Sequence, residues 1–541
     1  MRRKHMPTAE FPLSYAIRGA YQRGEEDETL EPLVLVDKRG VPIGRFQKGD
    51  YVIFYDIRGE REIELTASLV DPAFNNFPTD KELKLHFVTM IEYDKKLPVR
   101  VAFPSRESLR DTLSEVISKH GLQQIKIAES EKAIHVCFFL NGKAGHPFPG
   151  EERLIIPSPS DISSYDQAPE MNIRQVAEAT IEKINDPRYA LIVTNFANVD
   201  VVGHTENSAA IKRAVETVDY YMGKVVEASR KAGRGVIVTA DHGTVEKWLY
   251  PEGTIDTGHT DSPVPLILLL PDEKQKGVTL REEGELLDVA PTILELLGLP
   301  QPQVMTGRSL VVNYSPAKNK RVKNLLLLIL DGWGLNDELR GNLIAQARTP
   351  VMDELWSKYP STRLKASGLA VGMPEGTVGN SEAGHLHLGA GRRVYSDRMR
   401  IDRAIEQRTF FSNEAFLWAM REAKRDNHPL HMLGIVSFYS SHGSLNYLLS
   451  LLKMAADFGL QEVYIHSLLG RRGERPESGA IYIEKVEEET HRLRLGKVVT
   501  VMGRYWALDR EENWDRVEKT YRSLIFGEGR RVKGGEVRSL P

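Results

Sequence analysis

"NLLLLILDGWG" spans residues 324–334 and decides the fold class of this chain. Its run of apolar residues at 325–330 is typical of a strand buried on both faces, as strands of helix-covered parallel sheets are. Asp331 follows the run directly, and Gly332 and Gly334 mark a turn. The pattern therefore predicts a strand of an α/β sheet that delivers a carboxylate to the sheet edge, as first strands of α/β enzymes often do. Here that strand lies past the middle of the chain.

Strand-like and helix-like segments alternate along much of the rest. Strands are predicted within "ALIVTNFANVD" (190–200), "GVIVTADHG" (235–243) and "VPLILLLP" (264–271), and helices over 208–233 and 286–300. A second such pattern covers about 425–525, and the first hundred residues are rich in β-type runs. This alternation predicts an α/β fold with a mostly parallel sheet and helices on both faces. A length of 541 residues exceeds one core and predicts at least two domains.

Composition excludes several classes of protein. The net charge of -3 gives no polyelectrolyte signal, so we expect neither nucleic acid nor an anionic membrane as a partner. The longest apolar runs, 265–270 and 325–330, are too short to span a bilayer, and the N-terminus lacks an apolar signal core. We expect a cytoplasmic protein, monomeric by default, that meets any acidic substrate with a local cluster of Arg and Lys.

Candidate metal ligands follow several of the predicted strands. They are Asp200 and His204 in "NVDVVGH", Asp241 and His242 in "TADHG", His259 in "TGHTDSPVP", and Asp331 in "LDGWG". Each alone is more often a cap, a turn former or a satisfied polar group. Together, carboxylates and imidazoles at one sheet edge can build two adjacent divalent-cation sites, and this mixture suits Mn or Zn better than Ca. Paired metals would clamp a phosphoryl group and polarise a nucleophile.

A candidate nucleophile lies in "PEGTVGNSEAGHLHLGAGRR" (374–393). Ser381 stands between Asn380 and Glu382 at a predicted helix start, where backbone N–H groups can hold an anion. The alternative is that Ser381 is only an N-cap. Basic side chains that could hold a phosphorylated acid are Arg58, Arg61, Arg504, Arg510 and Lys132, although each alone is more often a surface charge.

Several long motifs resemble one known family. "DGWG", "VGNSEAGHLHLGAGR", "GRYWALDR", "ESEKAIHVCFFLNG", "NFANVDVVGHT", "VTADHG" and "HTDSPVP" resemble the cofactor-independent, metal-dependent phosphoglycerate mutases of the alkaline phosphatase superfamily. The resemblance covers nearly the whole chain, but the order differs. Residues 25–310 resemble the later part of the family and residues 323–530 its beginning. This order indicates a circular permutation joined through the polar, basic stretch 311–323, which we expect to be an exposed linker or a surface loop.

The resemblance implies a two-domain architecture. An alkaline-phosphatase-like domain with the metals and the nucleophile would be contiguous over 104–394. A smaller transferase-like α/β domain that binds substrate would be assembled from 1–103 and 395–541. The strand before Asp331 should then lie in the same sheet as the strand before Asp241, with both acids facing one site.

The resemblance also implies roles for residues. Asp200, His204 and His259 match one metal site, and Asp331, Ser381, Asp241 and His242 match the other, with Mn2+ favoured and Zn2+ or Co2+ as alternatives. Ser381 matches the serine that carries the phosphoryl group. The substrate-binding set that the resemblance implies consists of Arg58, Arg61, Lys132, His442, Arg472, Arg504 and Arg510.

Two departures from the family leave the reaction open. Phe438 stands where the family has Asp, and Gly470 and Gly473 replace both acids of its "DGRDTPP" loop, with Glu474 one residue away. The main expectation is interconversion of 3-phosphoglycerate and 2-phosphoglycerate through a phosphoserine, independent of 2,3-bisphosphoglycerate. The alternative is a metal-dependent phosphohydrolase or a phosphomutase for a different phosphorylated acid. A third possibility is a non-enzymatic paralogue that binds a phosphorylated metabolite.

Overall fold

The computed structural model describes residues 11–105, 108–314, 321–438, 440–470 and 477–534. The chain forms two compact units. Arg106–Met399 form the contiguous unit, and Met1–Ser105 with Arg400–Pro541 form the two-ended unit. Each unit has its own eight-stranded sheet and its own hydrophobic core. The predicted α/β fold class with mostly parallel sheets is confirmed.

The predicted strand at 325–330 lies inside the sheet of the contiguous unit. Strand β13 (Leu325–Leu330) lies between β7 (Tyr189–Phe196) and β8 (Gly235–Thr239) and is parallel to both. All six β13 residues are fully buried, which explains the unbroken apolar run. The full order is β11 (Glu283–Glu285), β14 (Ser361–Lys365), β9 (Val264–Leu269), β8, β13, β7, β5 (Gln123–Glu129) and β6 (Glu151–Ile156). The prediction that the strands before Asp331 and Asp241 share a sheet is confirmed.

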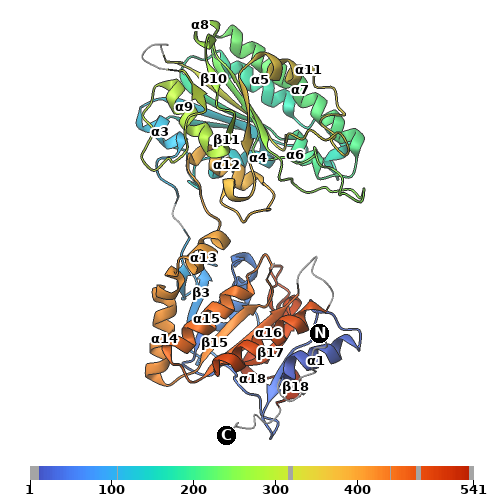
Figure 1. The fold of residues 1–541 in the computed structure, drawn as a ribbon, viewed down its shortest axis with the longest axis vertical. Coiled ribbons are helices and arrows are strands. Elements are labelled where there is room, and N and C mark those ends of the chain that lie inside the picture. The colour runs from blue at the N-terminus through green and yellow to red at the C-terminus, as the bar shows by residue number, and fades with distance from the viewer. Residues whose placement is uncertain (1–10, 106–107, 315–320, 439, 471–476, 535–541) are drawn as a thin grey trace. The chain divides into compact units, whose positions relative to one another are not determined.

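Helices cover both faces of this sheet. Figure 1 shows α5 (Ile173–Ile184), α7 (Ser208–Lys231) and α11 (Pro350–Lys358) on one side. On the other lie α3 (Leu113–Lys119), α9 (Val289–Leu297) and α12 (Ser381–Ala390). Shorter elements complete the unit: α4 (Ser130–Ile134), the π-helix η2 (His135–Phe139), η3 (Tyr165–Gln167), α6 (Asn198–Gly203), α8 (Asp272–Gln275), β10 (Thr279–Leu280), η4 (Leu286–Asp288), β12 (Val311–Val312), η5 (Gly368–Val371) and the start of α13 (Asp397–Glu406).

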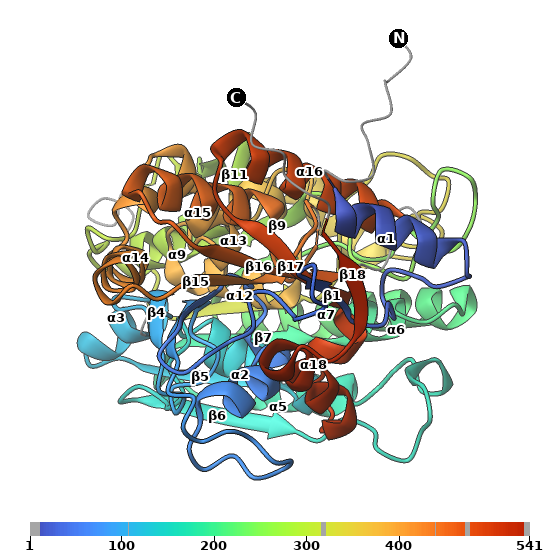
Figure 2. The same cartoon turned by 90° about the horizontal axis from the view of Figure 1, so that it is seen from below.

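The sheet of the two-ended unit combines strands from both ends of the chain. Its order is β18 (Arg530–Lys533), β1 (Leu33–Val36), β17 (Lys497–Gly503), β16 (Val463–Leu469), β15 (Leu430–Ile435), β2 (Tyr51–Phe54), β3 (His86–Ile91) and β4 (Arg100–Phe103). Among the described strands of this sheet, the β1–β17 pair is antiparallel and the other neighbours are parallel. Figure 2 shows β1, from the start of the chain, beside β17 and β18 from its end.

The helices of the two-ended unit also lie on two sides of its sheet (Figure 2). One group contains α14 (Glu414–Asp426), α15 (Leu445–Phe458) and α16 (Ser478–Leu493), with α1 (Pro12–Tyr21) packed on α16. The other contains α2 (Ile63–Val70), α17 (Arg504–Ala507) and α18 (Trp514–Phe526). Single 3-10 turns occur at η1 (Gly59–Arg61) and η6 (Thr409–Ser412).

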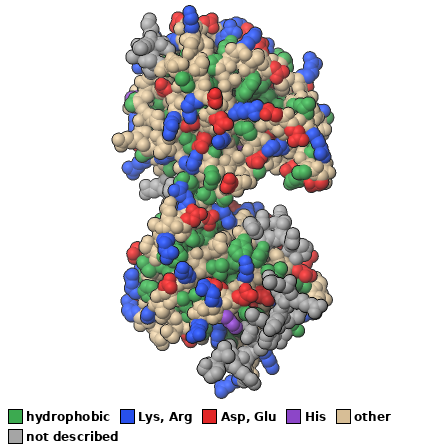
Figure 3. Space-filling view, in the orientation of Figure 1, with side chains coloured by type: hydrophobic (Ala, Val, Ile, Leu, Met, Phe, Trp, Pro, Cys, Tyr) green, Lys and Arg blue, Asp and Glu red, His purple; other side chains and the backbone are tan. Residues whose placement is uncertain are grey.

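The stretch 311–323 is partly exposed, as expected, with Val312, Asn313, Arg321 and Lys323 exposed, but two of its apolar side chains are buried. Val311–Val312 form β12 and pair with β10, and Tyr314 and Val322 are buried in the core of the contiguous unit. Residues 315–320 lie outside the described part. On the face shown in Figure 3, basic side chains are interspersed with acidic ones. Among the described residues, no helix combines the length and the apolar character that crossing a membrane requires.

Candidate functional site

Three carboxylates meet where neighbouring strands of the contiguous unit end. Asp331 follows β13, Asp241 follows β8 after one residue, and Asp200 lies on α6 just beyond β7. Asp331 donates its backbone N–H to the Phe196 carbonyl, 3.1 Å away, and Asp200 donates its own to the Asp331 carbonyl, also 3.1 Å away. All three side chains are at most 5% exposed. The shared direction of the three parallel strands therefore gathers these acids at one sheet edge.

A glycine permits this close approach. Gly332 has φ +81°, and a Cβ there would lie 2.8 Å from Asp200 Cα. No residue with a side chain fits that space without displacing Asp200, and the positive φ is itself unfavourable for other residues. The Gly that follows Asp331 in the sequence thus lets two acids share one site.

In the first predicted metal site, two imidazole nitrogens lie close to one carboxylate oxygen. Asp200 Oδ1 lies 3.2 Å from His259 Nε2 and 3.4 Å from His204 Nε2. The two imidazole nitrogens lie 3.2 Å apart. Atoms from Asp200, His242 and His259 all lie within 4.8 Å of one another. The structure therefore brings Asp200, His204 and His259 together and adds His242 to them.

The second predicted group surrounds Ser381. Its Oγ lies 2.9 Å from His242 Nε2 and 3.3 Å from Asp331 Oδ1. His242 Nε2 lies 3.4 Å from Asp241 Oδ2. Ser381, His242, Asp241 and Asp331 are thus one cluster of buried side chains.

Ser381 is not the N-cap of α12. Asn380 has that role, and its side chain accepts a hydrogen bond from the N–H of Ala383 at 2.8 Å. Ser381 is the first residue of the helix, and its hydroxyl points to the acids. The alternative interpretation of Ser381 as a cap is therefore wrong, because the residue before it caps the helix.

Lys132 lies among these acids. Its Nζ donates to Asp200 Oδ2 at 2.6 Å, to Asp331 Oδ1 at 2.7 Å and to Ser381 Oγ at 2.9 Å. Burial alone would raise the pKa of Asp200, but Lys132 and His242 outweigh burial and hold it well below its usual range. For Asp331, burial and the neighbouring Asp241 raise the pKa. Lys132 supplies one positive charge against three carboxylates.

The described arginines of the predicted substrate set lie in the two-ended unit, whereas Lys132 lies in the contiguous unit. Burial, followed by Arg510, Arg58 and Arg504, lowers the pKa of Arg61. Four guanidinium groups are therefore close enough to repel one another, as in a site built for an anion. Arg472 lies outside the described residues, as do Gly473 and Glu474.

Acidic side chains already contact part of this arginine set. Glu60 accepts from Arg58 at 2.9 Å and from Arg510 at 3.1 Å. Glu28 accepts from Arg504 at 2.7 Å. The Arg504 guanidinium also lies 3.4 Å from His442 Nε2, which places the predicted His442 beside the predicted arginines.

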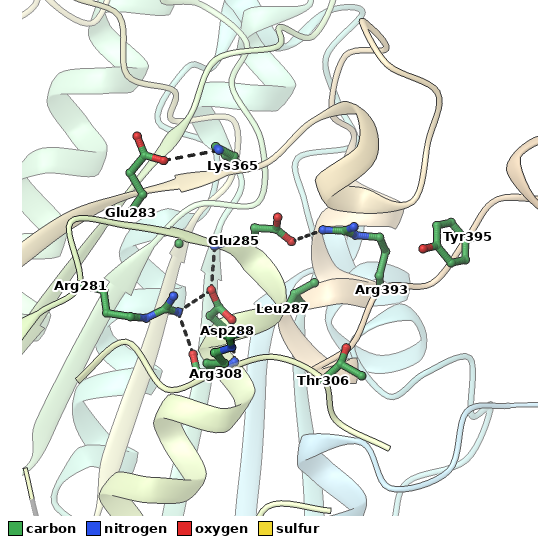
Figure 4. Close-up of a pocket in the computed structure, with 11 residues that line it drawn as sticks. Arg281, Glu283, Glu285, Leu287, Asp288, Thr306, Arg308, Lys365, Arg393 and Tyr395 are labelled. Atoms are coloured by element: carbon green, nitrogen blue, oxygen red, sulfur yellow. Dashed lines mark hydrogen bonds and ion pairs between the residues drawn. The ribbon is translucent and has the colours of Figure 1, made fainter. Parts of the chain in front are cut away.

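A separate cavity of about 460 Å³ in the contiguous unit contains none of the candidate metal ligands. Figure 4 shows that its basic side chains face acidic ones. Arg281 pairs with Asp288 at 2.7 Å, and Arg393 pairs with Glu285 at 2.6 Å. Because these charges neutralise one another, the cavity offers little net charge to a phosphorylated ligand.

Comparison with protein families decides the assignment. Residues 3–301 match the family described as the metalloenzyme superfamily. The chain belongs to the metalloenzyme superfamily. Residues 401–539 match a second family, described as the N-terminus of the BPG-independent phosphoglycerate mutases. A segment described as an N-terminus thus follows the metalloenzyme match in this chain.

Relatives of this metalloenzyme include proteins named 2,3-bisphosphoglycerate-independent phosphoglycerate mutase. The relative from Moorella thermoacetica is 45% identical over 300 residues, 55% of this chain and 57% of its own length. The relative from Methanococcoides burtonii is 45% identical over 302 residues with the same coverage. The chain therefore spans just over half the length of the curated relatives it matches. A solved phosphoglycerate mutase of Leishmania mexicana, at low cobalt concentration, aligns with a TM-score of 0.36 and 27% identity over 51% of this chain and 53% of that one.

The residues of this metalloenzyme fit divalent cations. Buried carboxylates must be paired with cations or coordinate metals, and Asp241 Oδ2 is buried beside imidazole nitrogens of His242 and His385, 3.4 and 3.2 Å away. Imidazole nitrogens stand beside the carboxylates in both groups, a donor set typical of Mn or Zn. The donors therefore match the metal dependence that the superfamily implies.

Sequence reasoning missed one member of this cluster. His385 Nδ1 lies 3.2 Å from Asp241 Oδ2, and its Nε2 lies 3.0 Å from Asn195 Nδ2. Atoms of Asp241, Asp331 and His385 lie within 4.8 Å of one another. Its position four residues after Ser381, on one face of a predicted helix, was a usable signal.

Proposed function

We propose that this chain is a 2,3-bisphosphoglycerate-independent phosphoglycerate mutase that interconverts 3-phosphoglycerate and 2-phosphoglycerate through a phosphoserine at Ser381. The observation that carries the proposal is the environment of Ser381 Oγ, 2.9 Å from both His242 Nε2 and Lys132 Nζ. A buried hydroxyl between a base, an ammonium group and three carboxylates is placed to act as a nucleophile. The names of the relatives support the choice of substrate.

The side chains of the contiguous unit would act on the phosphoryl group. Lys132 would neutralise charge on its oxygens, and the backbone N–H groups of Ser381 and Glu382 at the start of α12 would face it after transfer to Ser381. Asp200, His204 and His259 would hold one divalent cation, and Asp331, Ser381, Asp241 and His242 a second. Bound Mn2+, or Zn2+ or Co2+, would offset phosphoryl charge and make the serine hydroxyl easier to ionise.

The side chains of the two-ended unit would hold the acid. Arg58, Arg61, Arg504 and Arg510 form a cationic group suited to the carboxylate and phosphate of phosphoglycerate, with His442 beside them. The substrate would be a free phosphorylated acid, and the protein a cytoplasmic monomer.

We also propose that the chain is circularly permuted. The family match described as an N-terminus covers 401–539, after a match over 3–301. On this proposal, a phosphatase-like domain occupies about 104–394, and a transferase-like domain is assembled from 1–103 and 395–541. A reordered variant that begins near residue 323 and joins the present ends should retain activity.

Replacing Ser381 tests the phosphoserine. We expect Ser381→Ala to abolish turnover of 3-phosphoglycerate with Mn2+ present, while far-ultraviolet circular dichroism shows an unchanged fold. Ser357→Ala on α11 is a matched control, since Ser357 is exposed and its Oγ donates to the Glu354 carbonyl of the same helix. Substantial activity in Ser381→Ala would end the proposal.

Two positions favour a second candidate, a phosphohydrolase or a phosphomutase for another acid. Phe438 packs against Tyr482, with Lys485 Nζ 4.8 Å from the ring centroid, so this position supports packing and presents no acid. At Gly470 a Cβ would lie 2.7 Å from Glu28 Cα, so a side chain there would displace Glu28. Phosphorus NMR with 3-phosphoglycerate separates the two functions. 2-Phosphoglycerate indicates a mutase, free phosphate a hydrolase, and no change a different substrate.

A further inference from the structure

A buried pair of carboxyl groups lies beside His442 in the two-ended unit. Asp56 follows β2 and Glu62 precedes α2; both are fully buried, and His442 is 1% exposed. One oxygen of each carboxyl and one imidazole nitrogen all lie within 4.8 Å of one another. The sequence analysis assigned no role to either acid.

Half of the oxygen atoms in this pair have partners. Asp56 Oδ1 accepts the backbone N–H of Ile435 at 2.8 Å, and Glu62 Oε1 lies 3.0 Å from His442 Nδ1. The other oxygens, Asp56 Oδ2 and Glu62 Oε2, are buried without a hydrogen-bond partner among the described residues. Two carboxylates this close cannot both be ionised without a cation. Burial raises the pKa of both carboxyl groups, so a proton on one of them removes the charge repulsion between the two.

Two glycines make room for the pair. A Cβ at Gly434 would lie 2.6 Å from Asp56 Oδ1, and one at Gly443 would lie 3.2 Å from the same atom. The backbone on both sides of the Asp56 carboxyl therefore lacks side chains where that carboxyl lies. The two glycines thus leave the space that the Asp56 carboxyl group occupies.

The neighbours of His442 determine its tautomer. The Arg504 guanidinium, 3.4 Å from Nε2, can only donate hydrogen bonds, so Nε2 must carry a lone pair. Burial, then Arg504, Arg58 and Arg61, lowers the pKa of His442 to about 3, which leaves the ring neutral. The single ring proton is therefore on Nδ1, which donates to Glu62.

Three nearby charged or titratable side chains have partners other than the carboxyl oxygens of this pair. Tyr93 donates its hydroxyl to the Asp56 carbonyl at 2.8 Å and does not reach the carboxyl oxygens. Glu60 and Glu28 are bound to arginines and not to His442. The pair Asp56–Glu62 is thus the acidic partner of His442 among the described residues.

We propose that Asp56 and Glu62 hold one proton as a pair and act as positioning residues that fix the His442 tautomer, so that Nε2 presents a lone pair that can accept a hydrogen bond from a substrate hydroxyl. This inference rests on the proposed mutase function. In this role the ring stays neutral, with its proton on Nδ1 facing Glu62.

The decisive comparison is between Glu62→Gln and Asp56→Asn. The amide introduced by Glu62→Gln can donate to Nδ1 and stabilise the wrong tautomer, so we expect kcat to fall about 100-fold, the usual effect of removing one oriented hydrogen-bonding group, with KM changed less than about threefold. In Asp56→Asn the amide N–H replaces the shared proton, so we expect kcat within about fivefold of the parent. Glu487→Gln is a matched control, because Glu487 is a buried acid of the same unit that accepts the N–H groups of Leu13 and Ser14 and has no role in the proposed site, and we expect its kcat to be unchanged.

A second measurement does not depend on mutase activity. Nitrogen-15 NMR of His442 should show a protonated Nδ1 and an unprotonated Nε2 in the parent and in Asp56→Asn, with the pattern reversed in Glu62→Gln. If the parent lacks mutase activity but shows this pattern, the proposed function fails and the positioning role stands. The positioning role fails if Glu62→Gln keeps both the parent kcat and tautomer. It also fails if elemental analysis finds a divalent ion that is lost in Glu62→Gln, since a cation would then occupy the place of the shared proton.

Discussion

At the residue scale, Lys132 is the buried cation that pairs with two acids of the contiguous unit. Its ammonium group contacts two carboxylates and the candidate nucleophile, and the side chain is 4% exposed. A buried ammonium group stabilises nearby negative charge far more than an ammonium group in water does, because the effective dielectric constant of the interior is lower. A phosphoryl group attached to Ser381 would lie next to this ammonium group.

Lys132→Met should therefore reduce catalysis without unfolding the protein. We expect kcat to fall about 100- to 1,000-fold, the usual effect of removing one preorganised electrostatic group. Lys224→Met on α7 is the control, since Lys224 is exposed and its Nζ lies over the ring of Tyr220. Steady-state assays of both variants, with metal content measured, check this prediction. Equal kcat values for the two variants would contradict it.

The sequence predicted some site residues and missed others for identifiable reasons. Asp331, Asp241 and Asp200 could be predicted because each lies within four residues of the end of an apolar strand. His385 was missed because a histidine inside a helix is more often a satisfied core residue. Asp56 and Glu62 gave no signal, because their pairing with His442 depends on the packing of segments that are 380 residues apart for Glu62 and further for Asp56.

At the element scale, helix α12 depends on its cap. Asn380 accepts the N–H of Ala383 immediately before Ser381. Sequence reasoning located this helix start but considered only Ser381 as its cap, because both Asn and Ser are favoured caps and their propensities do not separate adjacent positions.

Asn380→Ala should destabilise the contiguous unit by about 1 kcal/mol, the typical loss for a removed N-cap. It should also lower kcat, since the next residue is Ser381. Asn413→Ala removes the cap of α14 in the two-ended unit and should cost similar stability while leaving kcat unchanged. Urea unfolding and steady-state assays measure both effects, and an unchanged kcat in Asn380→Ala would show that Ser381 does not depend on this cap.

A row of hydrogen bonds crosses three strands of the two-ended unit. Asp50 Oδ2 lies 3.0 Å from His431 Nε2, His431 Nδ1 lies 2.9 Å from His466 Nε2, and His466 Nδ1 lies 2.9 Å from Thr500 Oγ1. Burial lowers the pKa of His431 and, with His431, holds that of His466 well below its usual range. Both rings are therefore neutral in the folded protein, and a second proton on His466 would disrupt the row.

The row predicts a loss of stability in acid. Below a pH of about 6.5 the unfolded chain protonates these histidines and the folded chain does not, so the free energy of unfolding falls as the pH falls. We expect up to about 1.4 kcal/mol per pH unit for each histidine. Urea unfolding at pH 7 and pH 5 should show a smaller loss in His466→Gln than in the parent, and equal losses would contradict the assignment.

At the scale of the whole molecule, the two cores predict two unfolding transitions. No residue belongs to both hydrophobic clusters, and the candidate metal ligands all lie in the contiguous unit. A ligand stabilises only the unit that binds it, by about 2.7 kcal/mol at a concentration 100 times its Kd.

Mn2+ should therefore raise the melting temperature of one transition and leave the other in place. Differential scanning calorimetry of chelator-treated protein, with and without Mn2+, measures this. Asn413→Ala should lower only the metal-independent transition, which assigns it to the two-ended unit. A single transition, or equal shifts of both, would contradict the prediction.

The interleaved sheet of the two-ended unit also affects how the protein is made. Tyr51 on β2 pairs with Leu430 on β15, almost 380 residues later. At about 5–20 residues per second, a ribosome needs roughly 20–75 s to cover that distance. The contiguous unit is complete before the partner strand emerges and can fold first. Throughout that interval the nascent chain carries an apolar strand edge without its neighbour, a known hazard for aggregation.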